Sequence, residues 1–191
     1  DRKVGREDSL CAPHEYDLSP WLAPGRHRVT ICVNNKYPFS LGTFASSVSE
    51  HTQSNWNGIV GRIELRVMDR VWMDDLRVYP EVKRKEAVVR LRIRNETGHS
   101  IKGDVRASAS LENGGPAGER QTEFAVDGSS GTVELRVPMG EDVKLWDEFS
   151  PTLYRLEARL EAGSFRDELS VLFGMREIGV MKAVGATPRQ V

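Results

Sequence analysis

Apolar and polar residues alternate along most of the chain after residue 61. The clearest runs are residues 62–67, 89–94, 132–137 and 154–162, where every second residue is apolar and the residues between are mainly arginine and glutamate. A period of two places the apolar side chains on one face of an extended strand and the charged side chains on the other. The pattern predicts antiparallel strands with one face on a core and one in water, because strands of a parallel sheet are apolar throughout.

Seven candidate strands follow residue 68. They lie at 71–79, 87–95, 101–112, 119–126, 131–138, 152–162 and 165–174, and glycine-containing turn sequences separate most of them. Seven strands within about 100 residues predict an immunoglobulin-like β-sandwich. The Cys–Trp–Cys core of antibody domains is absent, so the expected match is one of architecture. Helix is expected only in the tail.

Residues 1–67 are richer in proline, glycine and aromatic residues. We expect a strand at residues 28–33, with Val29, Ile31 and Val33 on one face, and another at residues 61–67. Two or three strands cannot close a sandwich or a barrel. This half therefore either leans on the second domain or lacks its own N-terminal part. The fold class predicted for the whole chain is all-β.

Composition and charge narrow the range of functions. Of the 191 residues 39% are hydrophobic, which is enough to bury a core, and the formal net charge of −1 favours neither a nucleic-acid partner nor an anionic membrane surface. No apolar run approaches the roughly 20 residues that span a bilayer. No signal peptide is visible, but the chain starts at Asp1 without an initiator methionine and enters in the middle of a pattern.

Metal sites and cofactors have no support in the sequence. The four histidines lack ligand spacing, and Cys11 and Cys32 fit no zinc or redox motif. We expect the two cysteines to be buried free thiols, with a disulfide between them as the alternative. No cofactor and no metal ligands are therefore predicted.

The best candidates for ligand contact lie in a polar loop before residue 61. Gln53, Asn55 and Asn57 surround one large aromatic residue, Trp56. Amides supply hydrogen bonds for hydroxyl groups, and an indole supplies a flat apolar face, which is the combination that a sugar surface requires. We predict these four residues as carbohydrate-binding. The alternative is that Trp56 anchors the loop and the amides satisfy backbone groups in turns.

Several motifs, in order along the chain, resemble glycoside hydrolase family 2, the β-galactosidase, β-glucuronidase and β-mannosidase group. They are Pro-His-Glu-Tyr-Asp-Leu at 13–18, Leu-Ala-Pro-Gly-Arg-His-Arg-Val-Thr-Ile at 22–31, Val-Asn-Asn at 33–35, Asn-Trp-Asn-Gly-Ile-Val-Gly-Arg-Ile-Glu-Leu at 55–65, Leu-Trp at 145–146, Pro-Thr-Leu-Tyr-Arg-Leu at 151–156 and Phe-Gly-Met-Arg-Glu-Ile at 173–178. The resemblance covers about residues 4–178.

The resemblance implies a layout and an activity for the parent protein. Residues 1–67 would be the C-terminal part of a sugar-binding jelly-roll domain, and residues 68–178 the immunoglobulin-like domain. Family members are retaining glycosidases that use two glutamates held about 5 Å apart on a (β/α)8 barrel. That barrel would begin after residue 178, so the resemblance implies no catalytic residue in this chain. A bacterial parent is expected to be periplasmic or secreted.

The tail departs from this pattern after Ile178. Residues 176–191 instead resemble the cytoplasmic coupling segment of FtsX-like transporter permeases, in which Arg-Glu-Ile-Gly and Gly-Ala-Thr are typical. Ile178, Met181 and Val184 have helical spacing. We expect residues 179–191 to be a short helix or disordered.

Three functions remain open from the sequence. The first is the non-catalytic N-terminal portion of a family 2 enzyme, which would support the barrel and bind a β-glycoside with it. The second is an autonomous carbohydrate-binding or adhesion module. The third, motivated only by the tail, is an extracytoplasmic domain associated with a transporter. Arg90, Arg92 and Arg94 form a basic face that either binds an anion or is solvated or paired across strands.

Overall fold

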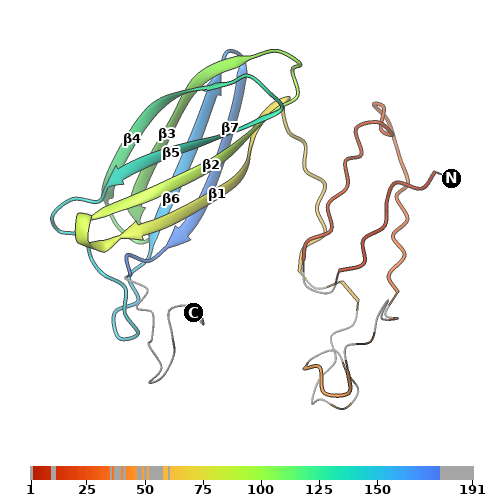
Figure 1. Ribbon diagram of the computed structural model, residues 1–191, viewed down its shortest axis with the longest axis horizontal. Helices are drawn as coiled ribbons and strands as arrows, with labels where there is room; N and C mark the ends of the chain where they lie inside the picture. The colour runs from red at the N-terminus through yellow and green to blue at the C-terminus, as the bar shows by residue number, and fades with distance from the viewer. Residues whose placement is uncertain are drawn as a thin grey trace. The chain divides into compact units, whose positions relative to one another are not determined.

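The computed structural model describes residues 2–9, 12–34, 36, 40, 42–46, 49, 51, 58–59 and 61–176 (Figure 1). The chain divides into two compact units, Asp1–Leu65 and Arg66–Val191. The seven strands of the described residues all lie in the second unit. The predicted domain limits at residues 67 and 178 remain predictions.

The second unit is a two-layer antiparallel sandwich. Its strands are β1 (Val71–Glu81), β2 (Glu86–Asn95), β3 (Ile101–Leu111), β4 (Pro116–Val126), β5 (Ser130–Pro138), β6 (Tyr154–Ala162) and β7 (Phe165–Phe173), with a 3-10 turn η1 (Val82–Arg84) after β1. One sheet has the order β1-β2-β5 and the other β4-β3-β6-β7 (Figure 1). The predicted all-β class and immunoglobulin-like architecture are confirmed here, and each strand lies within three residues of its predicted limits.

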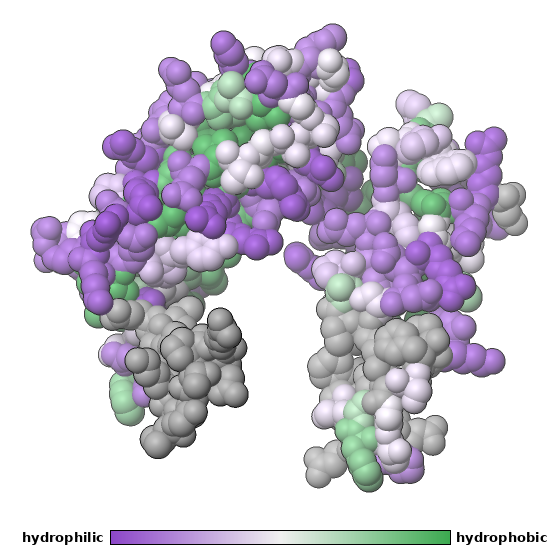
Figure 2. Space-filling view, viewed as in Figure 1, coloured by the Kyte–Doolittle hydropathy of each residue, from purple (hydrophilic) through white to green (hydrophobic). Residues whose placement is uncertain are grey.

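Alternation in the sequence explains which side chains form the core. In β2, Val89, Leu91 and Ile93 are fully buried, while the arginines between them point outward. The inner faces of β3 and β6 contribute in the same way, so that both sheets bury one apolar face against the other. Figure 2 shows the result as a band of hydrophobic residues across the sandwich, bordered by hydrophilic ones.

A β-bulge in β1 lets core residues with different spacing face the same side of the strand. Val71 and Met73 are buried, but Leu76 and Val78 also face the core, which requires the chain to change parity between them. The register against β2 shifts between Met73 and Asp75, so one extra residue, Asp74, is accommodated there.

Tyr154 forms the corner between the two sheets. It lies at the start of β6, is only 2% exposed, and packs against Phe173 with 5.7 Å between ring centroids. Its hydroxyl accepts a hydrogen bond of 2.7 Å from the backbone N–H of Lys144, ten residues earlier in the β5–β6 connection. This is the tyrosine corner of immunoglobulin-like sandwiches, which ties a long connection to the core.

Asn95 fastens two turns at one end of the sandwich. It is 4% exposed, and its side-chain amide donates hydrogen bonds to the carbonyls of His99 (2.8 Å) and Gly128 (3.0 Å). Its side-chain oxygen accepts bonds from the backbone N–H and the hydroxyl of Thr97. Residues 95–97 form a glycosylation sequon, but this amide is buried and bonded in the fold, so it is not available as an acceptor.

Asn95→Ala is expected to lower the free energy of unfolding by about 2 kcal/mol, because two carbonyls of the end turns lose their donor. Urea unfolding followed by tryptophan fluorescence measures the loss. The matched control is Asn113→Ala, at an exposed asparagine of the β3–β4 loop, which should change stability by less than about 0.5 kcal/mol. We call the hydrogen bonds of the Asn95 side chain to His99, Gly128 and Thr97 the Asn95 clasp. Equal losses in the two variants would show that this clasp contributes nothing to stability.

The first unit differs from the sequence-based prediction. Residues 28–33 and 61–67 form no strand, and no backbone hydrogen bond between described residues involves them. The apolar side chains of both segments are exposed: Val29 61%, Ile31 58%, Val33 48%, Ile63 68%, Leu65 69% and Val67 92%. Alternation encodes an extended segment, but a strand also requires a neighbour that accepts and donates its backbone bonds. The jelly-roll assignment of residues 1–67 remains a prediction.

Local contacts organise the described part of this unit. The Leu18 carbonyl accepts the N–H groups of Trp21 and Leu22, and the Asp17 carboxylate accepts the N–H of Ser19. These Ser19 hydrogen bonds lower the pKa of Asp17. The turn before residue 22 is therefore fixed by its own sequence.

Three further expectations concern the cysteines, the membrane and the tail. Cys32 is a free thiol as expected, but it is exposed rather than buried. Cys11 lies outside the described residues. Within the described part of the chain, no helix has the length and apolar character needed to cross a membrane. The permease-like tail also lies outside the described residues, from residue 177 onward.

Candidate functional site

The predicted sugar-contact residues, Gln53, Asn55, Trp56 and Asn57, lie outside the described residues. The structure does describe the glycines that follow them. Gly58 has a φ of 84° and Gly61 a φ of 99°, which is the left-handed region that residues with a side chain rarely adopt. These two dihedral angles show that the backbone changes direction at Gly58 and at Gly61. Carbohydrate binding by the loop stays a prediction.

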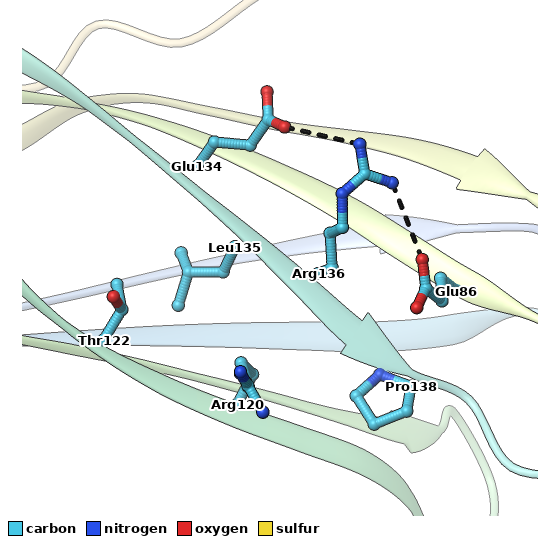
Figure 3. A pocket seen from close by; sticks show the side chains of 7 residues that line it. All are labelled: Glu86, Arg120, Thr122, Glu134, Leu135, Arg136 and Pro138. Atoms are coloured by element: carbon cyan, nitrogen blue, oxygen red, sulfur yellow. Dashed lines mark ion pairs between the residues drawn. The ribbon is translucent and has the colours of Figure 1, made fainter.

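The sandwich carries a shallow hollow of about 470 Å³ between the edges of β4 and β5 (Figure 3). Seven residues line it: Glu86, Arg120, Thr122, Glu134, Leu135, Arg136 and Pro138. None of them is aromatic, so the hollow lacks the flat apolar face on which a sugar ring stacks. It lies at the opening between the two sheets, beside their edge strands β4 and β5.

Two glutamates flank one arginine in this hollow. Arg136 lies between Glu134 and Glu86 (Figure 3), at 3.7 Å and 3.5 Å from their carboxylate oxygens, and it also donates a 3.1 Å hydrogen bond to Glu81. The hydrogen bond with Glu81 is the main reason that the pKa of Arg136 is raised. The β2–β5 register produces the pairing, since Glu86 lies opposite Pro138 and Arg136 lies opposite Val88.

This arrangement differs from the carboxyl pair of a retaining glycosidase. Such a pair requires one carboxyl group held as an acid by an apolar or like-charged environment, with the sugar between the two groups. Here a guanidinium occupies the space between Glu86 and Glu134, whose side chains are 30% and 40% exposed. The hollow is therefore an ion-pair cluster on the sandwich surface.

Cross-strand ion pairs also account for the basic face of β2. Arg90 donates a 2.8 Å hydrogen bond to Glu134 on β5, and this bond is the main cause of its raised pKa. Arg92 and Arg94 both approach the Asp74 carboxylate, at 2.8 and 3.3 Å. Cross-strand pairing was one of the interpretations of this face, and the structure confirms it. The bulge in β1 places Asp74 where it meets two arginines.

The end of the sandwich where β7 stops is built around Trp146. Its backbone N–H donates a 2.9 Å hydrogen bond to the Met175 carbonyl, and the guanidinium of Arg176 lies 4.6 Å from its ring centroid. Gly174 makes this approach possible, because a Cβ there would lie 2.8 Å from the Cβ of Trp146. Met175 is fully buried, so the chain is held in place up to its departure from the sandwich.

A tight turn beside Trp146 presents an exposed aromatic side chain. The Asp147 carboxylate accepts the N–H groups of Phe149 (2.8 Å) and Ser150 (2.7 Å), and an isolated bridge between Trp146 and Pro151 closes the turn. Phe149 is 90% exposed at its tip, and Leu145 before it is 49% exposed. A rigid turn with an exposed aromatic residue is typical of an anchor for a packing partner.

No site for a metal ion emerges from the part of the chain that the structure describes, where no three His, Cys, Asp or Glu side chains cluster suitably. Sequence reasoning did find Trp146 and Pro151 as family motifs. It missed that they form one turn with Phe149 at the tip. The Asp-x-x-Ser-Pro sequence at 147–151 was the available signal, because aspartate before such a turn caps two backbone N–H groups.

Comparisons with known proteins agree with this architecture. A β-galactosidase of Thermoanaerobacterium thermosulfurigenes is 24% identical over 127 residues, which are 64% of this chain and 18% of that protein. A glycosyl hydrolase family 2 member from Bacteroides cellulosilyticus superposes with a TM-score of 0.51 at 18% identity, over 59% of this chain and 16% of the other. At that identity the superposition shows a shared fold. The chain spans less than a fifth of the length of these two relatives.

The family model of glycosyl hydrolases family 2 matches residues 71–176. The matched range begins at the first residue of β1 and ends at the arginine that lies on Trp146. It therefore contains the sandwich from its first strand to its exit. Since the match covers more than half of the 191 residues, the chain belongs to glycosyl hydrolases family 2.

Proposed function

We propose that this chain is a non-catalytic portion of a family 2 glycoside hydrolase, most like the β-galactosidases, whose parent enzyme hydrolyses O-glycosidic bonds of β-glycosides. Its role is to support a catalytic barrel and to shape the substrate entrance. The family match carries this proposal. It coincides with the sandwich, and the aligned segment is only 18% of a β-galactosidase relative.

The sandwich supports this role as a rigid spacer. Several of its outer charges are paired with neighbours on adjacent strands, as in the Arg90–Glu134 and Arg106–Glu119 pairs. Exposed pairs of this kind contribute little energy and offer no acid to protonate a leaving group. The sandwich therefore contributes shape and attachment to the proposed enzyme, and the chemistry belongs to the barrel.

The end with Trp146 is the proposed contact with the barrel. A polypeptide that continues from Arg176 starts beside the turn that exposes Leu145 and Phe149. Tethering raises the effective concentration of a following domain at this surface, which favours its packing there. The loop with Trp56 is proposed to reach the mouth of the barrel and to contact the sugar together with it.

The proposal predicts that the purified chain has no glycosidase activity. Release of nitrophenol from nitrophenyl β-galactoside, β-glucuronide and β-mannoside should equal the buffer rate, because the Arg136 guanidinium occupies the space between the two glutamates of the hollow. The double variant Glu86→Gln, Glu134→Gln provides the matched control. If the chain released nitrophenol and the double variant did not, the proposal would be contradicted, and the glutamates of the sandwich would be catalytic.

An autonomous carbohydrate-binding or adhesion module is the competing function. Calorimetric titration with galactosides and with plant or host glycans separates the two, since the proposal expects no binding by this chain alone. Millimolar or tighter binding that Trp56→Ala removes without lowering the melting temperature would favour the competing function.

A further inference from the structure

The β3–β4 loop contains the sequence Asn113-Gly114 at its tip. Asn113 is exposed, and its side-chain amide makes no hydrogen bond to any described residue. The loop runs from Glu112 to Gly115 between β3 and β4, whose last pair before the loop is Ser110 with Pro116. An unrestrained asparagine followed by glycine in a turn is the arrangement in which asparagine is chemically least durable.

We infer that Asn113 is a site of spontaneous deamidation in the folded protein. The backbone nitrogen of Gly114 attacks the side-chain carbonyl carbon of Asn113 and loses its proton to solvent. A new C–N bond closes a five-membered succinimide ring, while the bond to the side-chain nitrogen breaks and ammonia leaves. Water then opens the ring at either carbonyl, which yields aspartate or isoaspartate.

Glycine at position 114 favours this reaction. It carries no Cβ, so nothing shields the backbone nitrogen, and its dihedral freedom lets the nitrogen rotate toward the side chain. A Cβ at Gly114 would lie 3.0 Å from the Cβ of Leu111, closer than most real contacts. Within the fold the Gly114 N–H donates a 3.1 Å hydrogen bond to the Leu111 carbonyl, and this bond must open before the nitrogen can attack.

Asn95 shows the opposite environment in the same domain. It is buried, its amide nitrogen is bonded to two carbonyls, its oxygen accepts two bonds from Thr97, and Glu96 follows it. Ring closure at Asn95 would break all of these hydrogen bonds. The attacking backbone nitrogen would belong to Glu96, whose side chain hinders its approach. The fold therefore protects Asn95 and leaves Asn113 open.

The product would alter the hairpin. Isoaspartate inserts one extra carbon into the backbone of a loop closed by the hydrogen bond from the Leu111 N–H to the Gly115 carbonyl, at 3.1 Å. It also adds a negative charge beside Glu112, which is 3.9 Å from Arg155. We expect loss of the Gly114 hydrogen bond and a more acidic chain, with the sandwich core intact.

The test uses the folded chain held at mildly alkaline pH and digested with trypsin at intervals. Residues 107–120 form one peptide in which Asn113 is the only asparagine, and residues 95–102 form another that carries Asn95. Mass spectrometry measures the loss of amide in each peptide, and labelling by an isoaspartate methyltransferase identifies the product. We expect progressive loss at Asn113, with isoaspartate formed, while Asn95 keeps its amide.

Two comparisons decide the outcome. In urea, where the clasp is absent, Asn95 should lose more amide than in the folded chain, while loss at Asn113 should change little. Gly114→Ala should retain the amide of Asn113, and Asn113→Gln should abolish labelling of the peptide. Retention of Asn113 in the folded chain, while the free 107–120 peptide loses its amide, would overturn the inference. Equal loss at Asn113 and Asn95 in the folded chain would also overturn it.

Discussion

Tyr154→Ala is expected to lower the free energy of unfolding of the sandwich by about 4 kcal/mol. The side chain is 2% exposed, and its ring fills the corner between β6, Phe173 and the β5–β6 connection. Alanine removes the ring, leaves a cavity, and frees the Lys144 N–H that the hydroxyl held. Urea unfolding with an unchanged m-value measures the loss.

Tyr154→Phe is the control for this prediction. It keeps the ring against Phe173 and removes only the hydroxyl that accepts the Lys144 N–H, so it should cost about 1 kcal/mol. If both variants lost the same free energy, the hydrogen bond and not the packing would explain the role of Tyr154. If neither lost stability, the corner would not hold the connection.

Gly118→Ala is expected to lower the free energy of unfolding by about 3 kcal/mol, at the upper end of the range for overpacking. A Cβ at Gly118 would lie 1.8 Å from the carbonyl oxygen of Pro138, where β4 passes the end of β5. Both groups belong to the backbone, so relief requires one strand to move rather than one side chain to rotate. The bulge between Ala109 and Ser110 shifts the register at the same end of the β3–β4 pair.

Gly115→Ala is its matched control in the same hairpin. A Cβ at Gly115 would meet nothing within 4 Å. Alanine there should leave stability unchanged within about 0.5 kcal/mol. Thermal unfolding of both variants, followed by circular dichroism, distinguishes close approach of strands from a general cost of replacing glycine. Identical melting temperatures for the two variants would show that β4 and β5 are not held against each other at Gly118.

The strands of the sandwich could be predicted from the sequence, because the apolar and polar alternation that specifies each strand lies within the strand itself. Burial of Val89, Leu91 and Ile93 with Arg90 and Arg92 outside follows directly from alternation. The bulge at Asp74 could not be placed in the same way, because it depends on which residues of β2 face β1. The tyrosine corner also required the fold, since Tyr154 and Lys144 meet only once the β5–β6 connection turns back.

The first unit shows where such reasoning fails. Residues 28–33 alternate as clearly as a core strand, and yet Val29 and Ile31 are exposed. The alternating pattern specifies an extended backbone with one apolar face. Formation of a strand also depends on a partner strand with which its backbone groups can form hydrogen bonds. Pattern alone carries no information about that partner.

The candidate site divides in the same way. Trp56 and its neighbouring amides were selected for their chemistry, and their role remains a prediction. The cluster of Glu86, Glu134 and Arg136 could not be anticipated, because Glu86 lies on β2, far in sequence from the two β5 residues, and meets them only through the β2–β5 pairing. The pairing of Arg92 with Asp74 likewise required a register that the sequence does not state.

The anchoring of Trp146 to Met175 and Arg176 has a mechanical consequence. The polypeptide leaves this end from a backbone that is fixed by a hydrogen bond, a ring contact and a buried methionine. We therefore expect little independent rotation between the sandwich and the residues that follow Arg176. Gly174 permits these contacts, and a larger residue there would push the backbone away from Trp146 and make the connection more flexible.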